Sequence, residues 1–278
     1  MANRLALLLP LLAALVVGIG LGAAVMLQGG GGRPAPVSAG DTPTATENAP
    51  TVAARVRPSG SVCQGLARQP APGEPRAFAP EYTQQRRVLG LTVVADGRVD
   101  SRAFDEAAKT IERLFQGNDL QQALTAAQAY VVIADKDQGV LDLPEFACLE
   151  GQLGSDFFSN VCGVADRADY PVATVNELDL LGDRKGPCGG LNILYHELGH
   201  LVQGWAISPA DYFDIKLAYQ AALDAGKYRN AYAATNSNEY FAEATQAYFL
   251  HVEGSHDRAW LRRYDPAIYE ILARVYGD

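Results

Sequence analysis

Basic residues are scarce in this chain of 278 residues. Lys and Arg together number 23 against 32 Asp and Glu, which gives a formal charge of −9 at pH 7. A protein that binds a phosphate backbone needs clustered Lys and Arg to displace counterions. We therefore expect no nucleic-acid partner.

Charged residues are absent between Leu5 and Leu27. At about 1.5 Å per residue this stretch makes about 34 Å of helix, enough to cross a hydrocarbon core of about 30 Å. It is also longer than the apolar region of about 7–15 residues in a cleavable signal peptide. Residues 1–27 are therefore predicted to form an N-terminal transmembrane signal-anchor, with cleavage near Ala23-Ala24 as the alternative.

Aromatic residues are absent from residues 28–60, which are rich in Gly, Pro, Ala, Ser and Thr. Such a segment cannot bury enough apolar surface to offset the ordering of its chain. We assign residues 28–62 to a disordered linker and residues 63–278 to one folded domain. Arg4 favours a cytoplasmic N-terminus, so this domain is expected outside the cell membrane, single-pass if anchored and secreted if the first segment is cleaved.

Cysteine is limited to four residues, and no CxxC pair occurs among them. This spacing argues against a zinc site made of all four. An even number of cysteines in a domain outside the cytoplasm predicts two disulfides. Of the three possible pairings, we favour Cys162 with Cys188 and Cys63 with Cys148. The alternative is free buried thiols.

The folded part begins with strand and helix patterns and ends with helices. β-branched runs predict strands at Val88–Asp96, Ala129–Ala134 and Tyr170–Leu178. Helical spacing predicts a helix capped by Ser101 and a second helix at Leu120–Ala127, whereas residues 141–167 give an irregular, cross-linked stretch. Later helices are expected at Leu191–Trp205, Ala210–Ala225, Asn238–His251 and Pro266–Tyr276. The order indicates an α+β fold with a mixed sheet layer followed by a helical layer.

The sequence His196-Glu197-Leu198-Gly199-His200 is an HExxH motif. Residues four apart on a helix lie one turn above each other, so both imidazoles can bind one zinc ion. Glu197 is then placed to accept a proton from metal-bound water. The alternative is that the two histidines merely fill a polar helix face. It is unfavourable, because Glu197 would then be a buried charge without a partner.

A catalytic zinc needs a third protein ligand. The metzincin pattern is excluded, because Gln203 and Ala206 stand where it requires Gly and His. The remaining histidines, His251 and His256, are five apart and do not share a helix face, so we interpret them as surface or loop residues. A carboxylate on a later helix is the better candidate.

The segment Asn236-Ser237-Asn238-Glu239-Tyr240-Phe241-Ala242-Glu243 supplies such carboxylates. Asn236 or Asn238 can cap a helix that presents Glu239 in its first turn and Glu243 one turn later. We expect Glu239 to bind the metal and Glu243 to accept the ring N–H of a ligand histidine, most simply His196. The alternative is a solvated acidic helix face.

HELGH followed by NEYFAE resembles the gluzincin metallopeptidases, which include thermolysin-like enzymes, and the run EYFAEATQAYF is most similar to the peptidase domain of anthrax lethal factor. The resemblance covers about Gly186 to Leu250. It implies a zincin-like fold, in which a mixed sheet lies over the HExxH helix and an edge strand binds extended substrate. The 38 residues between His200 and Glu239 are a departure from the spacing in these enzymes. The resemblance therefore does not predict the intervening helix or the substrate pocket.

In lethal factor-like enzymes a tyrosine shortly before the glutamate ligand stabilises the oxyanion, and Tyr232 matches this position approximately, with Tyr228 and Tyr240 as rivals. The predicted function is a Zn²⁺-dependent endopeptidase acting on protein or peptide substrates. Substrate is expected along an exposed strand near Val131–Ala134 or Val172–Val175. The alternatives are a non-catalytic envelope binding protein on a zincin scaffold and a zinc amidase acting on cell-wall peptides.

Overall fold

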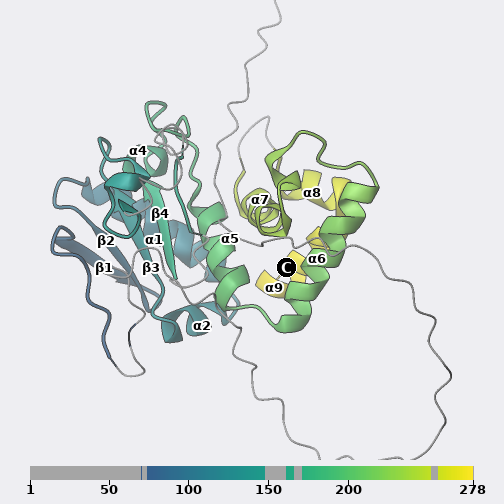
Figure 1. Ribbon diagram of the computed structural model, residues 1–278, viewed down its shortest axis with the longest axis horizontal. Helices are drawn as coiled ribbons and strands as arrows, with labels where there is room; N and C mark the ends of the chain where they lie inside the picture. The colour runs from purple at the N-terminus through teal and green to yellow at the C-terminus, as the bar shows by residue number, and fades with distance from the viewer. Residues whose placement is uncertain (1–69, 71–73, 148–160, 166–170, 252–255, 278) are drawn as a thin grey trace, which may run out of the picture.

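The computed structural model describes residues 70, 74–147, 161–165, 171–251 and 256–277 (Figure 1). The predicted anchor, the linker up to residue 62, Cys63 and Cys148 lie outside the described residues. Within the described residues, every helix is too short or too polar to cross a bilayer.

The N-terminal half is built on a four-stranded sheet in the order β1-β2-β3-β4. The strands are β1 (Gln84–Val88), β2 (Leu91–Ala95), β3 (Tyr130–Ala134) and β4 (Val172–Asn176). β1 and β2 pair antiparallel, and β2, β3 and β4 pair parallel. The sheet is therefore mixed, as predicted.

The predicted strand Val88–Asp96 is wrong at its start, because a hairpin turn falls inside it. Leu89 and Gly90 both have positive φ, 49° and 87°, and they connect β1 to β2. This backbone conformation is typical of two-residue hairpins. The sequence QQRRV of β1 was missed because its side chains alternate between partly buried and exposed and it contains a single β-branched residue, Val88.

Helices cover one face of the sheet. They include α1 (Ser101–Phe115), α2 (Leu120–Ala126), α4 (Glu177–Leu180) and α5 (Leu194–Trp205). Val93, Val131 and Val175 point into the core that these helices share. Asp100, one residue before the predicted cap Ser101, caps α1 by accepting a hydrogen bond from the Arg102 N–H. Ser101 is instead the first helical residue.

The opposite face of the sheet is covered by residues outside regular helices and strands. Val94, Val132 and Val172 pack there against Tyr82 and Phe146, both of which are buried. β2, β3 and β4 are therefore buried on both faces, which explains their continuous apolar sequences.

The C-terminal half is helical, and α5 lies between the sheet and the remaining helices (Figure 1). These are α6 (Pro209–Asp224), α7 (Ser237–Phe249), α8 (Arg258–Tyr264) and α9 (Pro266–Tyr276). The predicted helices are confirmed within a few residues, but α4 and α8 were not predicted. The strand predicted at Tyr170–Leu178 is wrong at its end, because β4 ends at Asn176 and α4 begins at Glu177. The α+β class and the zincin-like layer order are confirmed.

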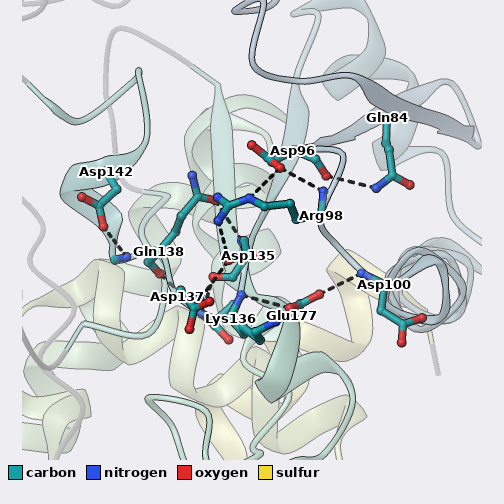
Figure 2. A network of polar contacts seen from close by, with 12 residues as sticks. Gln84, Asp96, Arg98, Asp100, Asp135, Lys136, Asp137, Gln138, Asp142 and Glu177 are labelled. Carbon is teal, nitrogen blue, oxygen red and sulfur yellow. Dashed lines mark hydrogen bonds and ion pairs between the residues drawn. The ribbon is translucent and has the colours of Figure 1, made fainter.

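A polar network joins the carboxyl ends of the strands (Figure 2). Arg98, after β2, contacts Asp96 at 3.0 Å and Asp135, after β3, at 3.4 Å. The buried Glu177, after β4, accepts hydrogen bonds from the backbone N–H groups of Asp100 and Lys136. One carboxylate thus fixes the starts of α1 and α4 to the end of β3.

Only one of the two strands predicted as the substrate edge lies at an edge of the sheet. β3 lies between β2 and β4, so the alternative at Val131–Ala134 is wrong. β4 ends the strand order of the described residues, and residues 161–165 run beside it. The Thr174 N–H donates to the Val164 carbonyl at 2.9 Å, and the Val164 N–H donates to Thr174 Oγ1 at 2.8 Å.

The predicted disulfide between Cys162 and Cys188 is present, with a Cα–Cα distance of 5.5 Å. It ties residues 161–165 to the loop before α5. The second predicted pair, Cys63 with Cys148, lies outside the described residues.

Candidate active site

The HExxH motif lies on the buried helix α5. The Asn192 side chain accepts a hydrogen bond from the Leu194 N–H at the start of this helix. His196 and His200, one turn apart, are 3 % and 4 % exposed, and their Nε2 atoms are 3.1 Å apart. The helix therefore aims both ring nitrogens at one point.

Glu239 reaches the same point from α7. Its N–H and that of Asn238 donate to the side chain of Asn236, which caps the helix and fixes its first turn. Glu239 Oε2 lies 3.2 Å from His196 Nε2 and 3.3 Å from His200 Nε2. A carboxylate separated from the motif by 38 residues thus converges on both imidazoles.

Gly199 lets the two helices approach closely enough for this convergence. A Cβ added to Gly199 would lie 3.2 Å from the Ala242 Cα and 3.2 Å from the Thr245 Cβ. These contacts are tighter than ordinary van der Waals separations. A larger residue at position 199 would therefore press α7, and with it Glu239, away from the histidines.

The donor set fits a zinc ion. Zinc bonds of about 2.0–2.2 Å in tetrahedral geometry separate neighbouring ligand atoms by about 3.3–3.6 Å. The observed separations of 3.1, 3.2 and 3.3 Å lie within a few tenths of an ångström of that range. Glu239 is fully buried, and its carboxylate faces the ring nitrogens of His196 and His200. A buried carboxylate aimed at two imidazoles suits a metal ligand.

The charges of Glu239 and His196 shift each other's pKa. Burial disfavours the charged form of Glu239, but contacts with His196 and His200 prevail and lower its pKa to about 2. Burial also works against the charged form of His196, yet Glu239 and Glu243 raise its pKa well above the usual value. The carboxylates that face the histidines thus favour a positive charge at this point, which suits a metal cation.

Glu243 contacts the outer side of one ligand histidine. Its Oε1 lies 3.0 Å from His196 Nδ1, and its side chain is 39 % exposed. The corresponding Nδ1 of His200 has no hydrogen-bond partner among the described residues. The contact can hold the tautomer in which His196 Nε2 faces the metal.

The sequence matches the family described as "Anthrax toxin lethal factor, N- and C-terminal domain" over residues 82–275 of 278. The chain belongs to this lethal factor family. Membership confirms the family that the two motifs predicted and the enzyme class, a zinc metallopeptidase.

Among solved structures, the chain is similar to the Pro-Pro endopeptidase PPEP-2 from Paenibacillus alvei, with 20 % sequence identity and a TM-score of 0.49. The alignment covers 66 % of this chain and 97 % of that chain. The comparison with curated proteins found no match.

In this lethal factor family member Glu197 lies beside residues 161–165. Glu197 is fully buried. A Cβ added to Gly163 would lie 3.1 Å from Glu197 Oε1 and 2.3 Å from the Thr174 carbonyl oxygen. Sequence reasoning missed Gly163 because the residues around it give a weak periodic signal.

Of the three candidate tyrosines, Tyr232 lies at the metal site. It begins a 3-10 turn (Tyr232–Ala234) just before α7, and its ring centroid is 6.2 Å from that of His196. Its hydroxyl is buried and lies near the Glu239 carboxylate. Burial and the negative charge of Glu239 raise the pKa of Tyr232, so the hydroxyl keeps its proton and can donate it.

The other two tyrosines belong to a packing network. The Tyr240 hydroxyl donates to Asp265 Oδ2 at 2.8 Å, and Lys227 Nζ lies 3.1 Å from Asp265 Oδ1. The Tyr228 ring packs edge-on against Tyr240, with centroids 5.5 Å apart. The buried Asp265, which no motif marked, thus anchors the loop before Tyr232.

The two remaining histidines lie outside the metal cluster. His251 is exposed and lies 3.5 Å from Asp257, and His256 stacks on Trp260 with centroids 3.6 Å apart. Their interpretation as surface residues agrees with these positions.

Proposed function

We propose that the protein is a zinc-dependent endopeptidase that works outside the cytoplasmic membrane. The observation that carries the proposal is the convergence of His196, His200 and Glu239 at mutual distances of 3.1–3.3 Å, with Glu197 on the same helix. A non-catalytic scaffold has no need of this complete set.

His196, His200 and Glu239 would hold the zinc ion. Zinc bound there supplies Lewis-acid chemistry, because it lowers the pKa of a water ligand toward neutrality and polarises the peptide carbonyl. Glu197 accepts a proton from the attacking water and donates it to the leaving amine.

Tyr232 and Glu243 assist these four residues. The protonated Tyr232 hydroxyl donates a hydrogen bond to the oxyanion, where a preorganised donor is effective because the site is largely buried. Glu243 holds the His196 ring in position through its contact with Nδ1.

Substrate lies in extended form along residues 161–165 and antiparallel to them. This segment passes next to Glu197 at Gly163, and the side chains of Val161, Cys162, Val164 and Ala165 are buried. The segment therefore recognises substrate through its backbone rather than through side chains. The predicted edge at Val172–Val175 supports the segment from behind.

The location rests on the disulfide and on the N-terminal sequence. Disulfides such as Cys162–Cys188 persist in oxidising compartments outside the cytoplasm. We propose a single-pass membrane protein held by residues 1–27 through the linker 28–62, or a secreted protein if the first segment is cleaved. Protease treatment of intact cells that produce the protein with or without residues 1–27 separates the membrane-anchored form from the secreted form.

The function is tested by metal analysis together with cleavage of casein and a peptide library. Wild-type protein should contain one zinc ion and cleave internal peptide bonds. Glu197→Gln should keep zinc and lose turnover by several orders of magnitude, whereas His196→Ala should lose both zinc and turnover. Absence of peptide cleavage by the zinc-loaded wild type would refute the endopeptidase assignment, and full activity in Glu197→Gln would refute the proposed base.

A further inference from the structure

A cavity of about 320 Å³ opens at the carboxyl ends of β3 and β4. Its lining includes Val161 and Cys162, and Thr174 and Asn176 of β4. Pro187, next to Cys188 of the disulfide, also lines the cavity. The cavity is thus built around the segment that carries Gly163.

The cavity begins close to the catalytic carboxylate. Val161 and Cys162 directly precede Gly163, where an added Cβ would lie 3.1 Å from Glu197 Oε1. An extended chain advances about 3.3 Å per residue, so Val161 lies about 7 Å from Gly163 along the segment. A substrate that passes Glu197 therefore reaches the cavity within two or three residues.

The direction of the segment indicates which part of the substrate reaches the cavity. Val164 pairs with Thr174, and the cavity wall places Val161 and Cys162 near Asn176, so the segment runs antiparallel to β4. A substrate antiparallel to the segment passes Gly163 before Val161 as its own chain proceeds from N to C. The cavity thus receives a residue on the C-terminal side of the cleaved bond.

The charges on the cavity wall favour an acidic side chain. Lys136 and Lys185 line it, and the ammonium groups of both lysines make no ion pair with any described residue. Asp137 is the single carboxylate among the described lining residues, so the wall carries a net positive charge within a chain of formal charge −9. The backbone of Lys136 is fixed by Glu177 (Figure 2).

We propose that this cavity is a specificity subsite that binds a Glu or Asp side chain of the substrate, located C-terminal to the cleaved bond. The inference rests on the proposed endopeptidase function. Lys136 and Lys185 pair with the substrate carboxylate, and the Cys162–Cys188 disulfide holds the Lys185 loop beside the substrate segment.

The test compares peptides that carry Glu, Gln or Lys at each of the first three positions after the cleaved bond. An exposed ion pair changes a binding constant by up to about fivefold, and two such pairs together by up to about 25-fold. With both lysines contributing, wild type should prefer Glu to Gln by about tenfold in kcat/KM at one position. Added salt should reduce this preference. Binding of the same peptides to zinc-loaded Glu197→Gln, measured by fluorescence anisotropy, should rank them identically.

The double variant Lys136→Glu and Lys185→Glu should reverse the ranking and prefer Lys. The matched control is Lys216→Glu on α6, an exposed lysine outside the cavity, which should leave the ranking unchanged. An unchanged preference in the double variant, with peptides still cleaved, would overturn the subsite alone. A wild type that cleaves no peptide would overturn the proposed function and the subsite together.

Discussion

Replacing Gly163 by alanine should separate the contribution of the substrate segment from that of the metal. The added Cβ would lie 2.3 Å from the Thr174 carbonyl oxygen, 2.6 Å from the Ile193 Cδ1 and 3.1 Å from Glu197 Oε1. The first contact is about 1 Å shorter than a normal van der Waals separation, and the backbone of β4 cannot rotate out of the way. The segment must therefore move by up to about 1 Å.

The expected consequence is a large loss of activity with zinc retained. A displacement of about 1 Å at reacting groups can lower a rate about 100-fold, so kcat/KM should fall by about that factor. Overpacking should also destabilise the fold by about 1–3 kcal/mol. The nearest atoms to the new methyl group belong to Thr174, Ile193 and Glu197 and not to His196, His200 or Glu239, so the zinc content should stay at one ion per chain.

The measurements are kcat/KM on one cleaved peptide, urea unfolding and zinc content by mass spectrometry. Gly204→Ala is the matched control, because Gly204 lies near the C-terminal end of α5 and an added Cβ would meet nothing within 4 Å. This change should keep activity and stabilise the fold by about 0.5–1 kcal/mol. If Gly163→Ala behaved like Gly204→Ala, the close passage of the segment past Glu197 would play no part in catalysis.

Two further changes probe the oxyanion group and the disulfide. Tyr232→Phe should lower kcat by about 10²–10³-fold with little change in KM, whereas Tyr228→Phe should retain kcat, and equal effects in both would contradict the role of Tyr232. Replacing Cys162 and Cys188 together by serine opens a loop with a sequence separation of 26 and should reduce the free energy of unfolding by about 3.5 kcal/mol. Urea unfolding measures this loss, and unchanged stability in oxidising buffer would refute the estimate.

Local sequence patterns account for most of the fold. The apolar runs of β2, β3 and β4 and the helical spacing of α1, α5, α7 and α9 depend on burial of one or both faces of each element, which leaves a periodic signal. The polar strand β1 and the short helix α8 escaped prediction. β1 is stabilised by its pairing with β2, a contact that no local window of sequence contains.

The chemistry of the site was readable from two short motifs, because ligand type and helical spacing are local properties. HExxH fixed His196, Glu197 and His200 on one helix, and the run from Asn236 fixed the cap and the carboxylates of another. The resemblance favoured Tyr232 but left Tyr228 and Tyr240 as rivals, since all three are aromatic residues near one glutamate in sequence. Their packing places the Tyr232 ring 6.2 Å from the His196 ring and the Tyr240 hydroxyl on Asp265.

The sequence by itself predicted the enzyme class, the layer order and the three residues that the structure brings together, His196, His200 and Glu239, since each follows from residue type and spacing within one or two helices. The tertiary structure alone decided that Gly199 and Gly163 permit close approach, that Asp265 anchors the loop before Tyr232, and that Lys136 and Lys185 share one cavity. These relations join segments far apart in the chain. They depend on the distances between packed elements, which no spacing along the sequence records.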